Sequence, residues 1–397
     1  MPKKSIDSHG LSVVQVSRRG ANRLKDGHVW VYRSDILAAD GVAPGALVAV
    51  VDEREKFLGT ALYSSASQIA IRMIAKEAVV DLDRLLRKRL QEAIAYRERV
   101  VRDTDAYRIV FSEGDFLPGL IVDRYNDLLS LQVLTQAMDT EAVRQVVVSE
   151  LTERLEPAAI VERVDPRVRD LEQLPARSSG LVQGEKTSTV FSMNGVRFHY
   201  EAFEGQKTGA FLDQRENYGA TSQYARGEAL DVFCYHGGFA LHLAPHCAKV
   251  TGVDSSRPAL EVADRNAALN GREIEWIEAN AFDLLRDYAS AGHQYDTIVL
   301  DPPAFAKSKS NLETALRGYK ELNLRALKML RPGGILVTCS CSYHVSPGEF
   351  IEVVAQAARD MHRNLRVLEN RGQAKDHPIL LAVPETGYLK CLMLAVS

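Results

Sequence analysis

Residues 229–239 read ALDVFCYHGGF, an apolar run that ends in a loop with two adjacent glycines. From this point onward short apolar runs alternate with segments of helical periodicity. We expect strands at 229–233, 250–254, 275–278, 297–301 and 335–339, helices over 256–270 and 312–330, and an antiparallel closing pair at 365–371 and 388–396. Such alternation indicates a mostly parallel sheet with helices on both faces. The sequence therefore predicts an α/β, Rossmann-like fold for residues 201–397.

The first two hundred residues have different patterns. Short β-rich runs between residues 11 and 78, broken by Gly and Pro, indicate a small β-barrel or sandwich. A helix over 81–102, strands at 109–111, 120–125, 128–134 and 159–163, and a helix over 140–155 indicate a central α+β module, and the polar segment 165–189 suggests loops. We predict three domains, over 1–80, 81–200 and 201–397.

Composition limits the classes of function. Hydrophobic residues make up 46% and charged residues 25% of the 397 residues, as in ordinary globular proteins. No apolar run approaches the roughly 18 residues of a membrane span, and no signal segment follows Met1, so we expect a cytoplasmic protein. Five cysteines without repeated spacing indicate reduced thiols and no structural metal. Seven Lys or Arg residues within 84–102 either contact a polyanion or form a solvated helix face.

Two acids and two glycines suggest the kind of cofactor. Asp231 begins the segment 231–239 at the edge where open α/β sheets bind ligands, and Asp254 ends the second strand at the same edge. The glycine spacing differs from the G-x-G-x-x-G of dinucleotide folds, which disfavours a nicotinamide oxidoreductase. Asp231 would repel phosphate but suits a zwitterionic or cationic cofactor such as S-adenosylmethionine; a plain strand-turn-helix is the alternative. Asn280, after the third strand, is a candidate contact for an adenine ring.

Two further motifs suggest the chemistry. Residues 301–305 read DPPAF and residues 338–342 read TCSCS, and each follows a strand of the predicted sheet. The prolines make a rigid lip, and Phe305 is suited to stack on a base. Carbon 5 of cytosine becomes nucleophilic only after a thiolate adds to carbon 6, which requires an accessible cysteine. In a strand Cys339 and Cys341 would share one face, with Cys341 nearer the ligand. Two alternatives stay open: a packed cysteine, and methylation of a base nitrogen by the DPPAF segment.

Six motifs together resemble a known family. Residues 27–32 look like the start of a PUA domain, 112–125 resemble a hallmark hairpin, and 207–215 resemble the segment that leads into a catalytic domain. With 231–239, 301–305 and 340–342, these motifs resemble the bacterial and archaeal 23S ribosomal RNA cytosine-5 methyltransferases. Ala304 stands where a related group carries a second cysteine, so the resemblance is to the single-cysteine branch. Asn280 stands where an acid is commoner, and Cys339 where another residue is usual.

The resemblance implies a class I S-adenosylmethionine-dependent enzyme that acts on ribosomal RNA. An intact ribosome would hide most bases, so we expect naked or partly assembled RNA as the substrate. The resemblance also implies Cys341 as the attacking thiol and Asp301 between cofactor and base. A homodimer is left open, and a non-catalytic RNA-binding assembly factor is the alternative from another class. The expected cofactor contacts are Gln214, Arg215, Asp231, Phe233, Tyr235, Gly237, Gly238, Asp254, Ser255, Asn280 and Asp301.

Overall fold

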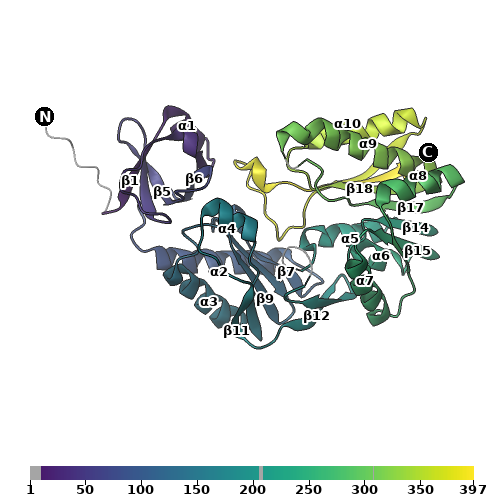
Figure 1. Cartoon of the computed structure of the whole chain (residues 1–397), viewed down its shortest axis with the longest axis horizontal. Coiled ribbons are helices and arrows are strands. Elements are labelled where there is room, and N and C mark those ends of the chain that lie inside the picture. Colours follow the sequence, from purple (N-terminus) through teal and green to yellow (C-terminus); the bar gives the residue numbers. More distant parts are fainter. Residues whose placement is uncertain (1–9, 205–208, 307) are drawn as a thin grey trace. The chain divides into compact units, whose positions relative to one another are not determined.

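The computed structural model describes residues 10–204, 209–306 and 308–397. These residues form two compact units (Figure 1). The first unit takes its residues from 1–189, 200–209 and 375–386, and the second takes its residues from 190–199, 210–374 and 387–397. The predicted boundaries of the three domains stay a prediction. None of the described helices is long and apolar enough to cross a membrane.

The N-terminal part of the first unit is a six-stranded sheet in the order β2-β6-β5-β4-β1-β3. The strands are β1 (Ser12–Val16), β2 (Trp30–Tyr32), β3 (Ile36–Ala38), β4 (Leu47–Val51), β5 (Phe57–Tyr63) and β6 (Ile69–Ala75). Helix α1 (Arg18–Lys25) begins at Ser17, whose hydroxyl accepts a hydrogen bond from the Gly20 amide. The core of this sheet is built from β-branched residues such as Val14, Val48 and Ile71, all fully buried. These strands confirm the predicted small β-rich domain.

The rest of the first unit contains a five-stranded sheet in the order β11-β10-β9-β8-β7. Its elements are α2 (Leu82–Val100), β7 (Ala106–Phe111), β8 (Leu120–Tyr125), β9 (Leu128–Val133), α3 (Glu141–Leu155), β10 (Ala159–Glu162), α4 (Pro166–Glu172) and β11 (Gly180–Gly184). Strands β12 (Ser188–Met193) and β13 (Val196–Glu201) form a separate pair.

The prediction of loops over 165–189 was wrong, because α4, β11 and the start of β12 lie there. Asp165 caps α4 and Pro166 occupies its first turn, which are ordinary helix-start signals. The polar composition is explained by ion pairs. Arg169 lies 2.9 Å from Asp139 and Glu172 lies 2.9 Å from Arg72, with both members of each pair buried or nearly so. In α4, charged residues therefore occupy buried positions. Apolar residues at these positions would have given the periodic pattern that predicts a helix.

The second unit is built on a seven-stranded sheet in the order β16-β15-β14-β17-β18-β20-β19. The strands are β14 (Glu228–Val232), β15 (Lys249–Asp254), β16 (Glu275–Glu278), β17 (Tyr295–Leu300), β18 (Leu330–Ser340), β19 (Leu365–Arg371) and β20 (Lys390–Val396). The helices are α5 (Arg215–Ser222), α6 (Gly238–Leu243), α7 (Arg257–Leu269), α8 (Ala281–Ala291), α9 (Leu312–Met329) and α10 (Pro347–Asp360). The first five strands are parallel and β20 lies antiparallel between β18 and β19. This arrangement confirms the predicted α/β fold and the antiparallel closing pair.

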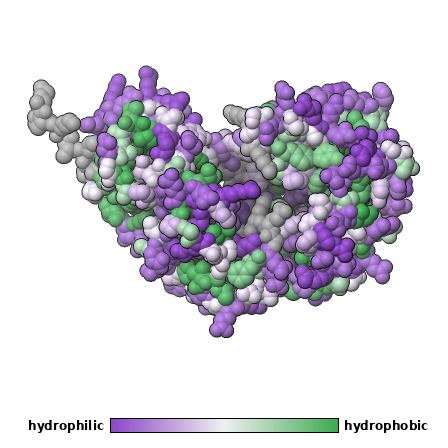
Figure 2. Space-filling view, in the orientation of Figure 1, coloured by the Kyte–Doolittle hydropathy of each residue, from purple (hydrophilic) through white to green (hydrophobic). Residues whose placement is uncertain are grey.

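One large apolar core supports the ligand edge of this sheet. It joins strands β14, β17 and β18 to α8, α9 and α10, and it includes Leu300, Tyr319 and Phe350, which are at most 1% exposed. The surface has a different character, since the face drawn in Figure 2 is mostly hydrophilic, with smaller groups of hydrophobic residues among the polar ones. Rigid packing beneath the strand ends holds the residues of the loops that follow them.

Candidate active site

The loop after β14 has an unusual backbone. Phe233, Tyr235 and Gly237 have positive φ angles of 68°, 48° and 83°, so three of five consecutive residues are left-handed. The amides of Phe233 and Cys234 both donate to the Val253 carbonyl, at 2.9 and 3.0 Å, and hold the loop against β15. Non-glycine residues in this conformation cost roughly 1–3 kcal/mol each and cluster at binding sites. The loop that the sequence singled out is therefore held in a strained shape where a ligand would bind.

Asp231 is a fully buried carboxyl group beneath this loop. Its Oδ2 accepts a hydrogen bond of 2.8 Å from the Ala240 amide in α6. Its Oδ1 is buried and has no hydrogen-bond partner among the described residues. Burial, together with the nearby charges of Asp301 and Asp254, raises the pKa of Asp231 to about 8, although the hydrogen bond from the Ala240 amide acts in the opposite direction. An acceptor left without a donor is costly, so this oxygen suits the amino group of a bound S-adenosylmethionine.

Asp254 and Asn280 follow the next two strands. The carboxylate of Asp254 accepts hydrogen bonds of 2.9 Å from the backbone amides of Tyr235 and Ser256. This joins the end of β15 to the strained loop. Ser255, which follows Asp254 in the sequence, is exposed. Asn280 is exposed, and its Oδ1 caps α8 by accepting from the Phe282 amide at 2.9 Å. Its position is thus explained by helix capping, and its contact with adenine stays a prediction.

Gln214 and Arg215 lie where a short 3₁₀ turn (Leu212–Gln214) passes into α5, and both are almost fully buried. The Gln214 Nε2 donates to Asp301 Oδ1 at 2.9 Å, and the Asn217 side chain donates to Gln214 Oε1 at 2.6 Å. The backbone amide of Asp301 also donates to the Val232 carbonyl at 3.2 Å. Asp301 is therefore held both by its side chain and by the end of β14.

Cys341 lies one residue beyond the end of β18, with its Sγ 3.9 Å from the Pro302 carbonyl oxygen. The expectation that Cys339 and Cys341 share a strand face does not apply, because Cys341 is outside the strand. Cys339 is fully buried opposite Cys391 in β20, and burial raises the pKa of its thiol well above the ordinary value. Cys341, which is partly exposed, is thus the cysteine brought to the lip that follows Asp301.

Phe305 and the residues around Cys341 form a polar and aromatic wall. Phe305 is half-buried, with its ring centroid 4.9 Å from that of Tyr319. The Tyr319 hydroxyl is 2.9 Å from Ser342 Oγ and accepts at 2.9 Å from Ser340 Oγ. The Ala306 amide donates to Ser342 Oγ at 3.1 Å. This network ties the DPPAF segment to the residues on both sides of Cys341.

The sequence reasoning missed Tyr319, Ser340, Ser342 and Lys390 as parts of this site. Lys390 is buried, and its Nζ donates to the Ser342 carbonyl at 2.7 Å. Two signals were present in the sequence. Serines flank the cysteine in the TCSCS motif, and Lys390 is the one charged residue of the otherwise apolar strand KCLMLAV.

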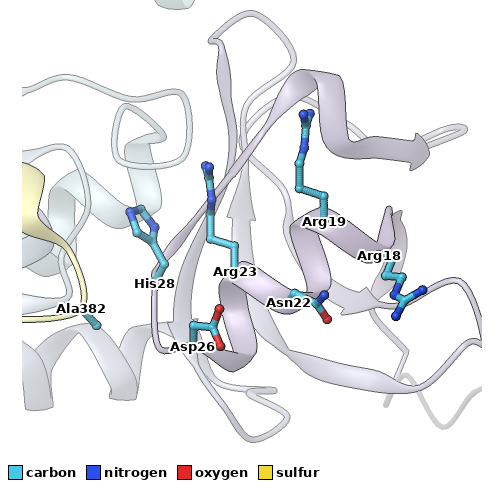
Figure 3. Close-up of a pocket in the computed structure, with 7 residues that line it drawn as sticks. All are labelled: Arg18, Arg19, Asn22, Arg23, Asp26, His28 and Ala382. Carbon is cyan, nitrogen blue, oxygen red and sulfur yellow. The ribbon is translucent and has the colours of Figure 1, made fainter.

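A second candidate site lies on the first unit, where three arginines of α1 and its N-terminal turn border a cavity of about 720 Å³. Arg19 and Arg23 extend from the same side of α1, and Arg18 points away from them (Figure 3). Arg23 lies over the Tyr32 ring at 4.5 Å, and Arg19 pairs with Asp35 at 2.6 Å. The lining residues are Arg18, Arg19, Asn22, Arg23, Asp26, His28 and Ala382. The run of arginines at 18, 19 and 23 was the signal that sequence reasoning passed over.

The basic stretch 84–102 is partly structural. Arg97 is buried and pairs with Asp115, Arg87 lies 3.0 Å from Glu150, and Arg89 donates to the Ile74 carbonyl at 3.2 Å. Fewer of these cations are therefore available to a polyanion than the sequence suggested. Over residues 10–204, 209–306 and 308–397, no group of three or more His, Cys, Asp or Glu side chains is arranged to hold a metal ion.

Known proteins and protein families that resemble this chain show which class of protein has this fold and site. A PUA-like domain model matches residues 14–76, and an S-adenosylmethionine-dependent methyltransferase model matches residues 127–388. The chain is similar in fold to SMU.776, a candidate methyltransferase solved in complex with SAH (TM-score 0.83, 19% identity, 96% of this chain and 99% of that chain).

Curated relatives have higher identity. Ribosomal RNA large subunit methyltransferase I of Photobacterium profundum is 38% identical over 92% of this chain and 95% of its own length. The Shewanella denitrificans protein of the same name is 39% identical over 93% of this chain and 95% of its own.

The fold, the strained loop and the buried acid define an S-adenosylmethionine-dependent methyltransferase with a PUA-like domain. This confirms the enzyme class and the cofactor expected from the sequence. Among such enzymes, the chain belongs to the family of the ribosomal RNA large subunit methyltransferases I.

Proposed function

We propose that this enzyme methylates carbon 5 of a cytosine in large-subunit ribosomal RNA, with Cys341 as the nucleophile. One observation carries the proposal: a partly exposed thiol lies 3.9 Å from the Pro302 carbonyl, directly after Asp301. The ribosomal substrate comes from the names of the curated relatives. Covalent catalysis needs a thiol that reaches the base, and the more deeply buried Cys339 and Cys391 do not meet that need.

The chemistry follows from these positions. The Cys341 thiolate adds to carbon 6 of the ring, and the displaced electron pair makes carbon 5 nucleophilic. Asp301 holds the base edge and, when protonated, supplies a proton to ring nitrogen 3. The bound cofactor supplies a methyl group from its sulfonium centre to carbon 5. The proton on carbon 5 then leaves to a base. The carbon–sulfur bond to Cys341 breaks, ring nitrogen 3 returns its proton to Asp301, and the aromatic ring is restored.

The PUA-like part of the first unit supplies RNA affinity in this proposal. Arg18, Arg19 and Arg23 are suited to phosphate contacts, which provide most sequence-independent affinity. The target base must leave its stack before the thiol reaches it, so naked or partly assembled RNA in the cytoplasm is the proposed substrate. Phe305 then supplies one aromatic face for that base.

The test uses unmodified large-subunit RNA carrying tritium at carbon 5 of its cytosines. We expect tritium release that depends on S-adenosylmethionine, loss of release in Cys341→Ala, and unchanged release in Cys247→Ala, which removes a partly exposed thiol elsewhere. Methyl incorporation without tritium release would refute carbon 5 and indicate a base nitrogen. No binding of S-adenosylmethionine in calorimetry would instead indicate a non-catalytic RNA-binding factor.

A further inference from the structure

Lys390 is a buried lysine beside the cysteine loop. It begins β20 and lies directly opposite Ser340 in the β18–β20 register. Its side chain donates to the carbonyl oxygens of Ser342 at 2.7 Å and Tyr388 at 2.8 Å. Ser342 is the residue immediately after Cys341, so the ammonium group is fixed against the chain that carries the nucleophile.

The charge of Lys390 has no carboxylate partner. Among the described residues no acidic side chain lies within ion-pair distance of its Nζ, and its two hydrogen-bond acceptors are neutral carbonyls. Buried lysines are normally paired with an anion. The titratable group that interacts electrostatically with Lys390 is the Cys341 thiol.

The other titratable groups near this position already have partners. Among the acids, Asp301 accepts a hydrogen bond from Gln214, Asp213 accepts one from the Tyr388 hydroxyl at 2.6 Å, and Glu369 pairs with Arg371. The Tyr319 hydroxyl is hydrogen-bonded to Ser340 and Ser342. Cys339 lies opposite Cys391 in the neighbouring strand. Burial lowers the pKa of Lys390 to about 8, and the interaction with Cys341 acts in the opposite direction. The side chain is therefore still mostly cationic at pH 7.

We propose that the Lys390 ammonium stabilises the Cys341 thiolate and so keeps the nucleophile ionised at neutral pH, an inference that rests on the proposed role of Cys341. Ionisation of the thiol releases its proton to solvent and gives the buried cation its missing counter-ion. An adjacent cation is a general means of lowering a thiol pKa. When the thiolate is consumed by addition to the base, the counter-ion is lost, and it returns when the carbon–sulfur bond breaks. Lys390 thus acts as a positioning residue that favours both formation and departure of the thiolate.

The test measures alkylation of Cys341 by iodoacetamide as a function of pH, with mass spectrometry to follow each cysteine of the full-length chain. In Lys390→Met the profile should move to higher pH by at least one unit, so that the alkylation rate at a pH well below the midpoint falls at least tenfold. Lys390→Arg keeps the positive charge and should retain a profile close to that of the wild type. Cys247 is the internal control, since burial already raises its pKa to about 11 and its rate should be equal in all variants.

A merely structural lysine would give a different result. If Lys390→Met has the wild-type pH profile at Cys341, the proposal is overturned. If that variant does not fold, Lys390→Gln replaces it, because Gln keeps a hydrogen-bond donor and removes the charge; an unshifted profile then overturns the proposal equally. Alkylation requires neither RNA nor methyl transfer. Failure of the tritium test with a lysine-dependent Cys341 profile would therefore refute carbon-5 chemistry alone.

Discussion

Gly238→Ala adds one methyl group at the first residue of α6, directly after the strained loop of residues 233–237. A Cβ built at this position lies 2.5 Å from Cζ and 2.6 Å from the hydroxyl oxygen of Tyr218, whereas ordinary contacts are 3.4–4 Å. Tyr218 has little room to withdraw, because it is 5% exposed and packs on Phe239 and His242 with ring centroids 4.7 and 5.3 Å away. Overpacking of this kind costs about 1–3 kcal/mol.

The matched control is Gly348→Ala in the first turn of α10, where an added Cβ meets no atom within 4 Å and the backbone is not left-handed. We expect Gly238→Ala to lower the thermal midpoint by about 2–12 °C and to weaken S-adenosylmethionine binding. The control should be neutral or stabilised by up to about 1 kcal/mol. Differential scanning calorimetry and titration calorimetry measure both quantities. If the two variants have equal midpoints and equal cofactor affinities, the packing of Gly238 against Tyr218 does not support the loop.

Three further predictions follow from charges. Because burial raises the pKa of Asp231 to about 8, cofactor binding to the carboxylate at pH 7 should release about one proton. Calorimetry in buffers of different ionisation enthalpy measures the number of protons released. A dissociation constant that does not change between pH 6 and pH 9 would contradict this prediction. Burial lowers the pKa of His242 from 6.5 to about 4, so its contribution to stability is present above pH 6.5 and is lost as the pH falls, by up to about 1.4 kcal/mol per pH unit. The free energies of unfolding in urea of the wild type and of His242→Gln should therefore diverge as the pH falls from 6.5 towards 4. Parallel pH dependences of the two proteins would exclude the effect. Arg18→Ala should reduce the slope of log binding constant against log salt concentration for RNA by about 0.7–0.9, as measured by filter binding. The control is Arg359→Ala, on an exposed face of α10, which should leave that slope unchanged.

The parallel strands of the second unit could be predicted because their apolar runs are short, are mostly buried in β14, β15 and β17, and are separated by helices of clear periodicity. The same rule failed for α4. There Arg169 and Glu172 enter the interior as ion pairs with partners far away in sequence, and hydropathy cannot distinguish a buried pair from a solvated surface.

The candidate site was predictable where chemistry is local to a motif, as for Asp231, the two glycines and Cys341. Its supporting residues depend on strand register, which no local pattern specifies. Ser340 and Lys390 are fifty positions apart in the sequence, yet they are direct neighbours in the sheet. Asn280 shows that a local pattern can also be explained in a second way. Its side chain is suited to contact a ligand, but its position is already explained by its role as the N-cap of α8.

The position of β20 between β18 and β19 has a consequence for biosynthesis. On a growing polypeptide β19 has no strand to pair with until residues 390–396 have been made, since β20 is its neighbour in the sheet. Synthesis of the 25 residues from 372 to 396 takes about 1–5 s at roughly 5–20 residues per second. Throughout that interval the nascent chain already carries Asp231, Asp301 and Cys341 but lacks Lys390. Translation therefore delays formation of the proposed pair of Lys390 and Cys341 until β20 has been made.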